Sequence, residues 1–192
     1  FVFQQIHLLE TLSLFDNAMA AGLLVSRDRA AVAARASTLF DQVGIDAATR
    51  RKLPAQTSGG EAQRAAVVRA LVNSPDVLFA DEPTGALDQA SGTAVLDVLT
   101  SVRDEGQTVV LVTHDLKSAR RGDRVLYLRD GQIAGEVDLR TAGQGAGAQD
   151  AAIGNAASEN AARPGGAGTM GSDEAKAARD TALRSFLIDM GW

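Results

Sequence analysis

The chain has 192 residues, of which 45% are hydrophobic, and it carries a formal net charge of −5. This length allows one domain plus extra segments, and the acidic balance argues against a general nucleic-acid-binding protein, which usually shows a basic footprint. The sequence has no cysteine, which excludes disulfides and thiolate metal sites, and no apolar run approaches the roughly 20 residues that a bilayer-spanning helix needs. A membrane role would therefore have to come through a partner.

The first part of the chain is predicted to be mainly helical after a short opening strand that ends near Gln4. Phe1 is not a starting methionine and no signal-peptide pattern follows it, so we expect a piece of a longer protein. Apolar residues then recur at helical spacing, with serine and glycine at the boundaries. The predicted helices cover about 13–25 with Ser13 as cap, 26–43 with Ser26 as cap and Gly44 at the end, a short turn within 46–53, and 58–71.

From residue 77 onward, short apolar runs alternate with helical segments. The run Val77–Ala80 is closed by turn residues, which predicts a fully buried strand. Strands joined through helices of this length imply a parallel sheet with helices packed on it. The other predicted elements are a helix over 89–103, a strand over 108–113, a short helix over 116–120, and strands 124–128 and 132–139 joined by a hairpin turn at Asp130-Gly131.

The C-terminal segment differs in composition from the rest. Residues 140–172 consist mainly of Gly, Ala, Ser and Asn, which predicts a flexible linker. Residues 173–192 regain helical character, with Leu183, Phe186 and Met190 on one face. We expect a small docking helix there.

Two adjacent carboxylates, Asp81 and Glu82, directly follow the apolar run. Open α/β sheets bind ligands at the carboxyl ends of their strands, so both are expected at such an edge. One carboxylate there can hold a magnesium ion while its neighbour orients a water molecule for attack on a phosphate. The alternative is an acidic turn after a core strand.

The segment Ser58-Gly59-Gly60-Glu61 has two interpretations. Ser58 and Glu61 have the spacing of a capping box, which is a structural motif. Two consecutive glycines in a first turn, however, weaken a helix by roughly 1 kcal/mol each relative to alanine. Because glycines let an anion approach the free N–H groups at a helix N-terminus, the segment also fits a phosphate-binding turn.

His114 and Gln4 each follow a predicted strand, as Glu82 does. A histidine in this position is commonly structural or solvated, and a glutamine commonly caps a loop. In a parallel sheet, however, these positions lie at one edge, so the side chains would point into the same crevice.

Taken in order, these residues resemble the ATP-binding subunit of ABC transporters over residues 1–139. The sequence of residues 81–88 is most similar to that of cassettes of macrolide and lipoprotein-release exporters. Thr57 and Glu61 depart from the usual Leu-Ser-Gly-Gly-Gln signature without removing its Ser-Gly-Gly part. The matching motifs are Phe3-Gln4 (Q-loop), residues 58–61 (signature), 77–82 (Walker B strand with the catalytic glutamate), 85–88 (D-loop) and 113–115 (H-loop).

The resemblance implies an α/β fold, namely a partial P-loop NTPase (RecA-like) parallel sheet with an inserted helical subdomain at about 6–73 and a catalytic core at about 74–139. The Gly-x-x-x-x-Gly-Lys-[Ser/Thr] phosphate loop (Walker A) does not occur in the 192 residues. In the family this loop and its strand lie upstream of the Q-loop, so we expect a chain that begins within the domain. Such a chain would complete another subunit's site without building a whole one.

The resemblance also implies a role for each motif residue, with ATP and Mg²⁺ as ligands. Asp81 would hold the magnesium ion, and Glu82 would orient or deprotonate the attacking water. His114 would contact the γ-phosphate, and Gln4 would reach the metal and the water. The signature would bind ATP held by the opposite subunit, and Asp88 would lie at the dimer interface. The signature residues are Ser58, Gly59, Gly60 and Glu61.

Two protein partners follow from the same resemblance. A second ATP-binding subunit would form a homodimer, and a membrane permease would contact the helical segment 6–73. The subunit would then be cytoplasmic and peripheral on the inner face of the cell membrane, with no nucleic-acid partner.

Three hypotheses stay open from the sequence. The first is an ABC-type ATPase subunit that powers export through a separate permease. The second is a catalytically inactive remnant or interaction fragment, which the missing phosphate loop favours for this chain alone. The third is a soluble ABC ATPase that does not transport, although such proteins usually carry paired cassettes, coiled coils or basic insertions.

Overall fold

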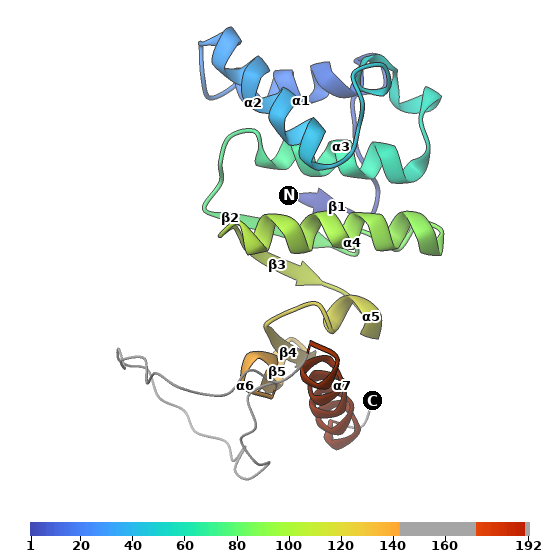
Figure 1. The fold of residues 1–192 in the computed structure, drawn as a ribbon, viewed down its shortest axis with the longest axis vertical. Coiled ribbons are helices and arrows are strands. Elements are labelled where there is room, and N and C mark those ends of the chain that lie inside the picture. The colour runs from blue at the N-terminus through green and yellow to red at the C-terminus, as the bar shows by residue number, and fades with distance from the viewer. Residues whose placement is uncertain (143–171, 191–192) are drawn as a thin grey trace. The chain divides into compact units, whose positions relative to one another are not determined.

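The computed structural model describes residues 1–142 and 172–190 (Figure 1). The chain divides into two compact units, Phe1–Arg121 and Gly122–Trp192, which are described separately below. Among the described residues, no helix has both the length and the apolar character needed to span a membrane.

The first unit contains a three-stranded parallel sheet in the order β1-β2-β3, made of Val2–Phe3, Val77–Asp81 and Thr108–Val112. Phe3 lies opposite Asp81, and Asp81 lies opposite Val112. The residues that follow these three positions therefore leave the sheet at one carboxyl edge. The parallel sheet predicted from the alternating pattern is confirmed.

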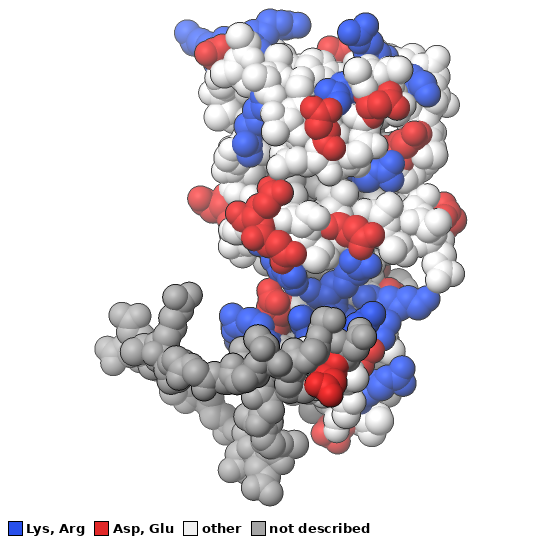
Figure 2. Space-filling view, in the orientation of Figure 1, with Lys and Arg blue, Asp and Glu red and all other residues white. Residues whose placement is uncertain are grey.

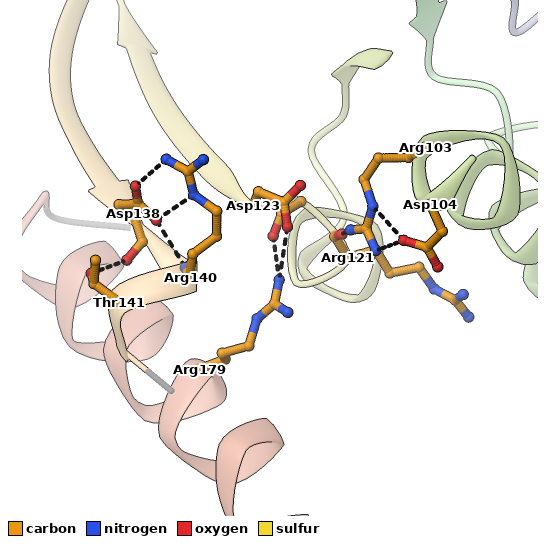
Figure 3. A network of polar contacts seen from close by, with 9 residues as sticks. Arg103, Asp104, Arg121, Asp123, Asp138, Arg140, Thr141 and Arg179 are labelled. Atoms are coloured by element: carbon orange, nitrogen blue, oxygen red, sulfur yellow. Dashed lines mark hydrogen bonds and ion pairs between the residues drawn. The ribbon is translucent and has the colours of Figure 1, made fainter. Parts of the chain in front are cut away.

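Helices of the first unit pack on one side of this sheet and on one another (Figure 1). The helices α3 and α4 share one buried core with the strands, through side chains such as Val68, Leu78, Val95 and Leu99. Near the end of α4, Arg103 donates to the carbonyl oxygen of Arg121 at 2.7 Å (Figure 3). The helices are α1 (Leu14–Leu23), α2 (Arg29–Gln42), α3 (Gly59–Leu71), α4 (Gln89–Asp104) and α5 (Leu116–Ala119), with 3-10 helices at Thr49–Arg51 and Pro54–Gln56.

The caps explain where the first two helices begin. Ser13 caps α1 as predicted, because its Oγ accepts a hydrogen bond from the backbone N–H of Asp16. The prediction that Ser26 caps the second helix is wrong. Asp28 caps α2 by accepting from Ala30 and Ala31, whereas the Ser26 hydroxyl accepts from the N–H of Asp28 itself. The aspartate two residues later is the cap instead of the serine, because its carboxylate accepts hydrogen bonds from two free N–H groups at once.

The prediction of a fully buried strand at 77–80 is also wrong. Leu78 and Ala80 are 0% and 1% exposed, but Val77 and Phe79 are 36% and 40% exposed. In the described residues, only the side of the sheet that carries Leu78 and Ala80 belongs to the core. On the other side the ring of Phe79 stacks on that of Phe1, with centroids 5.0 Å apart. Because every position of this run is apolar, the sequence does not show that buried and exposed side chains alternate along the strand.

Figure 2 shows the charges on one face of this unit. Blue and red side chains are interspersed over a mostly white surface, so neither sign dominates the part of that face formed by α1 to α4.

The second unit is built on the antiparallel pair β4 (Arg124–Arg129) and β5 (Gln132–Asp138). The predicted two-residue turn is confirmed, since Asp130 and Gly131 both have positive φ, 51° and 75°. The described residues of this unit also form the helices α6 (Leu139–Ala142) and α7 (Ser172–Asp189). The predicted C-terminal helix is therefore confirmed up to residue 189.

Helix α7 packs on the hairpin of its own unit. Leu139 and Leu183 are 0% and 1% exposed, and Phe186 lies against Gly135. Arg179 on α7 points to the carbonyl of Gly122, at 2.6 Å, and to Asp123 (Figure 3). The predicted linker at 140–172 begins inside α6, and its residues 143–171 lie outside the described part of the chain.

Candidate active site

Glu82 lies at the carboxyl edge of the sheet and is held there by strand β3 and the residues after it. Its N–H donates to the carbonyl of Val112 at 2.9 Å. Its carboxylate accepts from the N–H of His114 at 2.9 Å and contacts His114 Nδ1 at 2.6 Å. The Glu82 side chain is 20% exposed and that of His114 is 83% exposed. The structure thus brings the two predicted residues together, with the carboxylate sheltered and the imidazole open to solvent.

The backbone of Glu82 is in the left-handed region, with φ of 45°. A residue with an ordinary side chain avoids this region, and such a conformation costs of order 1 kcal/mol unless its surroundings hold it. The hydrogen bonds to Val112 and His114 hold it here. Backbone strain of this kind is common at functional sites, so it is consistent with the predicted role of Glu82.

Gln4 lies beside the turn that follows Glu82. A Cβ placed on Gly85 would lie 2.8 Å from Gln4 Nε2, so the amide of Gln4 lies directly against this turn. The turn closes through a bond from the Gly85 N–H to the Glu82 carbonyl at 3.0 Å. Gln4, Glu82 and His114 are thus neighbours of one edge, although they are up to 110 positions apart in sequence.

Asp81 is the last residue of β2 and is exposed, and its side chain has no hydrogen-bond or ion-pair partner among the described residues. No group of three or more His, Cys, Asp or Glu side chains that could hold a metal occurs in that part of the chain. This donor set suits magnesium, which is usually held by one or two carboxylates together with water and substrate phosphates. Asp81, whose β1 partner Phe3 directly precedes Gln4, therefore fits a magnesium ion that arrives with a nucleotide.

The turn at 58–61 forms the predicted capping box. Ser58 Oγ accepts from the N–H of Glu61 at 3.2 Å, and the Glu61 carboxylate accepts from the N–H of Ser58 at 2.8 Å. This bond from the Ser58 N–H is the main reason that the pKa of Glu61 is lowered. The structural interpretation is confirmed, and phosphate binding stays a prediction.

The two glycines of this turn also allow close packing against neighbouring residues, which was not predicted from the sequence. A Cβ on Gly60 would lie 2.8 Å from Cβ of Ser91 on α4, and one on Gly59 would lie 3.2 Å from Leu87. The start of α3 therefore rests directly on the start of α4. Asp88 caps α4, since one of its oxygens accepts from Ala90 and Ser91. Hydrogen bonding from Ser91, first from its side chain and then from its backbone, lowers the pKa of Asp88.

One buried side chain near the site was not predicted. Gln63 on α3 is 0% exposed, and its Nε2 donates to the carbonyl of Phe3, the residue before Gln4, at 2.9 Å. The only sequence signal was a glutamine at a position of α3 where the neighbouring turns place alanine and valine.

Comparison with known proteins gives the family. The model of the family described as "ABC transporter" matches residues 1–85. The "Macrolide export ATP-binding/permease protein MacB" of Sodalis glossinidius is 43% identical over 141 residues, which are 73% of this chain and 21% of that protein. Residues 1–85 of this chain are those of the ABC transporter family.

Further relatives agree with this assignment. The "Uncharacterized ABC transporter ATP-binding protein MJ1508" of Methanocaldococcus jannaschii is 41% identical over 69% of this chain and 59% of that protein. The dimeric post-hydrolysis structure of the ATP-binding cassette MJ0796, bound to ADP and Pi, matches with a TM-score of 0.62 at 36% identity, over 72% of this chain and 62% of that one. The mixed α/β fold with a parallel sheet is thus the fold of ABC ATPase cassettes. The chain spans 21% and 59% of the length of the two relatives named.

Proposed function

We propose that this chain is the part of an ABC transporter's ATP-binding subunit that carries the Q-loop, the signature, the Walker B carboxylates and the H-loop. The subunit binds and hydrolyses ATP and thereby powers export through a separate permease. The observation that carries the proposal is the contact of Glu82 with His114 at the carboxyl edge of the parallel sheet, beside Gln4. In open α/β sheets this edge is where ligands bind.

In this proposal the chain contributes a base and a phosphate contact to the reaction. Glu82 orients the attacking water and accepts its proton, from a sheltered position where its charge is less screened by solvent. Because an ionised carboxylate only accepts hydrogen bonds, the Nδ1 that faces Glu82 carries the ring proton of His114. Nε2 is then the ring nitrogen left for the γ-phosphate, and it donates to that group when the ring is an imidazolium.

Asp81 and Gln4 hold the magnesium ion in this proposal. A magnesium ion bound there would supply positive charge that offsets the negative charge developing on the phosphate. Phosphoryl transfer passes through a loose transition state, so the protein acts mainly by positioning and by electrostatic stabilisation. The register of β1 with β2 suits that task, because it places Phe3, the residue before Gln4, opposite Asp81.

The signature turn serves a second subunit. Ser58, Gly59 and Gly60 contact the γ-phosphate of ATP held by the opposite copy, and Asp88 lies at the interface between the copies. The dimeric ATP-binding cassette of similar fold supports this arrangement. The permease binds the helical segment 6–73, and the subunit works at the cytoplasmic face of the membrane. The name of the Sodalis relative, which joins an ATP-binding part to a permease, supports such a partner.

The 192 residues alone are expected to show negligible ATPase activity. They contain no Gly-x-x-x-x-Gly-Lys-[Ser/Thr] loop, which supplies the backbone cradle and the lysine for the β- and γ-phosphates. The alternative of an inactive remnant predicts the same for the chain but differs for the complete gene product.

The test measures ATP hydrolysis by the complete gene product that contains these residues. We expect turnover that Glu82→Gln lowers about 100-fold or more, the usual contribution of a positioned general base. The matched control is Glu105→Gln, which changes a carboxylate that is bonded to Gln42 and lies outside the site. Full activity of Glu82→Gln, or no turnover by the unsubstituted gene product, would contradict the proposal.

A further inference from the structure

Helix α3 holds the backbone on both sides of Gln4. The side chain of Gln63 donates to the carbonyl of Phe3 at 2.9 Å. Two turns further along α3, Arg69 donates to the carbonyls of His7, at 2.5 Å, and Ile6, at 3.3 Å. These contacts span 60 to 63 positions of sequence, so they join two separate parts of the fold.

The segment between these two anchors has few restraints of its own. Gln4 and Gln5 are exposed, and β1 ends at Phe3. His7 has a φ of 48°, in the left-handed region that residues other than glycine seldom adopt. The backbone of Gln4 thus leaves the sheet and returns to α3 within a few residues, and α3 fixes both ends of that path.

Gln63 is a poor choice for stability alone. Its side chain is fully buried, and its Oε1 has no hydrogen-bond partner among the described residues. A buried polar atom without a partner costs free energy, and an apolar side chain of similar shape would avoid that cost. The hydrogen bond to Phe3 is therefore the one interaction that glutamine provides at this position and an apolar side chain would not.

We propose that Gln63 and Arg69 form a clamp through which the signature helix α3 positions Gln4. The two side chains are positioning residues that act through the backbone of Phe3, Ile6 and His7. Because α3 begins at the signature turn, a shift of that turn would be transmitted to the loop that carries Gln4. The consequence for hydrolysis rests on the proposed function, whereas the clamp itself concerns only this chain.

The experiment follows the mobility of the loop in the full chain without nucleotide. The chain has no cysteine, so Gln5→Cys gives a single site for a nitroxide spin label. The Gln63 half of the clamp is removed by Gln63→Met, which keeps the length of the side chain and removes the donor. The matched control is Gln42→Met, which removes an exposed amide that bonds Glu105. Circular dichroism establishes that each variant is folded.

We expect Gln63→Met to raise the mobile fraction of the label relative to the immobile fraction by about two- to tenfold, as the loss of one hydrogen bond does. Gln42→Met should leave the spectrum unchanged. A folded Gln63→Met with the spectrum of the unsubstituted chain would overturn the proposal.

A second variant keeps the test decisive if Gln63→Met does not fold. In Gln63→Glu, the protonated acid donates to the Phe3 carbonyl and the carboxylate does not. Label mobility should therefore be low at acidic pH and rise as the carboxyl ionises, and a mobility that ignores pH would refute the clamp. Since no ATP is present, this outcome is independent of whether the complete gene product hydrolyses ATP.

Discussion

Ser58 combines two roles that a set of substitutions can separate. Its hydroxyl caps α3 in the structure, and in the proposed function the same residue contacts the γ-phosphate of an opposite subunit. Aspartate and asparagine cap helices as well as serine does, whereas alanine does not. Ser58→Asp and Ser58→Asn therefore keep the cap, and they differ only in the charge placed where the phosphate would bind.

The expected magnitudes differ enough to be told apart. Loss of the cap in Ser58→Ala should lower the free energy of unfolding by about 1 kcal/mol, within a usual range of about 0.5–2. Two unit charges about 4 Å apart near a protein surface repel by roughly 4 kcal/mol. This repulsion corresponds to a loss of roughly 1,000-fold in affinity for the phosphate, since about 1.4 kcal/mol is tenfold.

Two assays read the two roles. Urea unfolding of this chain measures the cap, with Ser58→Ala destabilised and the other two variants close to the unsubstituted protein. ATP-dependent dimerisation of the complete gene product, followed by size-exclusion chromatography in a Glu82→Gln background, measures phosphate contact. There Ser58→Asn should dimerise and Ser58→Asp should not.

Either half of the reasoning can be refuted alone. If Ser58→Asn unfolds as readily as Ser58→Ala, the hydroxyl is not acting as a cap. If Ser58→Asp dimerises as well as Ser58→Asn, no phosphate comes near residue 58.

Two further predictions concern the second unit. Hydrogen bonding from the Arg140 side chain lowers the pKa of Asp138 from 3.8 to about 2, so its stabilising effect is present above pH 4 and is lost as the pH falls through 2. Thermal unfolding between pH 5 and 2 should show this loss, and Asp138→Asn should flatten the pH dependence; an unchanged profile would contradict it. A Cβ on Gly135 would lie 2.9 Å from Phe186, so Gly135→Ala should weaken the packing of α7 by about 1 kcal/mol. Hydrogen exchange of the α7 amides should then accelerate about fivefold, and unchanged exchange would show that α7 does not rest on Gly135.

The positions of the site residues followed from the sequence because each is tied to the end of a strand. Apolar runs precede Glu82 and His114, and parallel strands bring their carboxyl ends to one edge. The capping box at Ser58 and the hairpin turn at Asp130-Gly131 were equally local, since each depends on residue types a few positions apart.

Other features depended on contacts that no local pattern records. The left-handed backbone of Glu82 is imposed by strand β3, and the residue type gives no hint of it. The exposure of Phe79 depends on which face the helices cover. The hydrogen bond from Gln63 to Phe3 joins positions 60 residues apart, and a single glutamine in the sequence does not predict such a partner.

The apolar face of the sheet has a practical consequence for work with this protein. Side chains from all three strands, among them Phe3, Phe79 and Val112, are 39–54% exposed on that face. Contiguous apolar surface of this kind promotes self-association and dye binding, which the net charge of −5 opposes only partly. Association of folded chains makes an unfolding midpoint rise with protein concentration. Unfolding curves for the variants above should therefore be recorded at several protein concentrations and extrapolated to infinite dilution. Self-association is then not counted as stability of the single molecule.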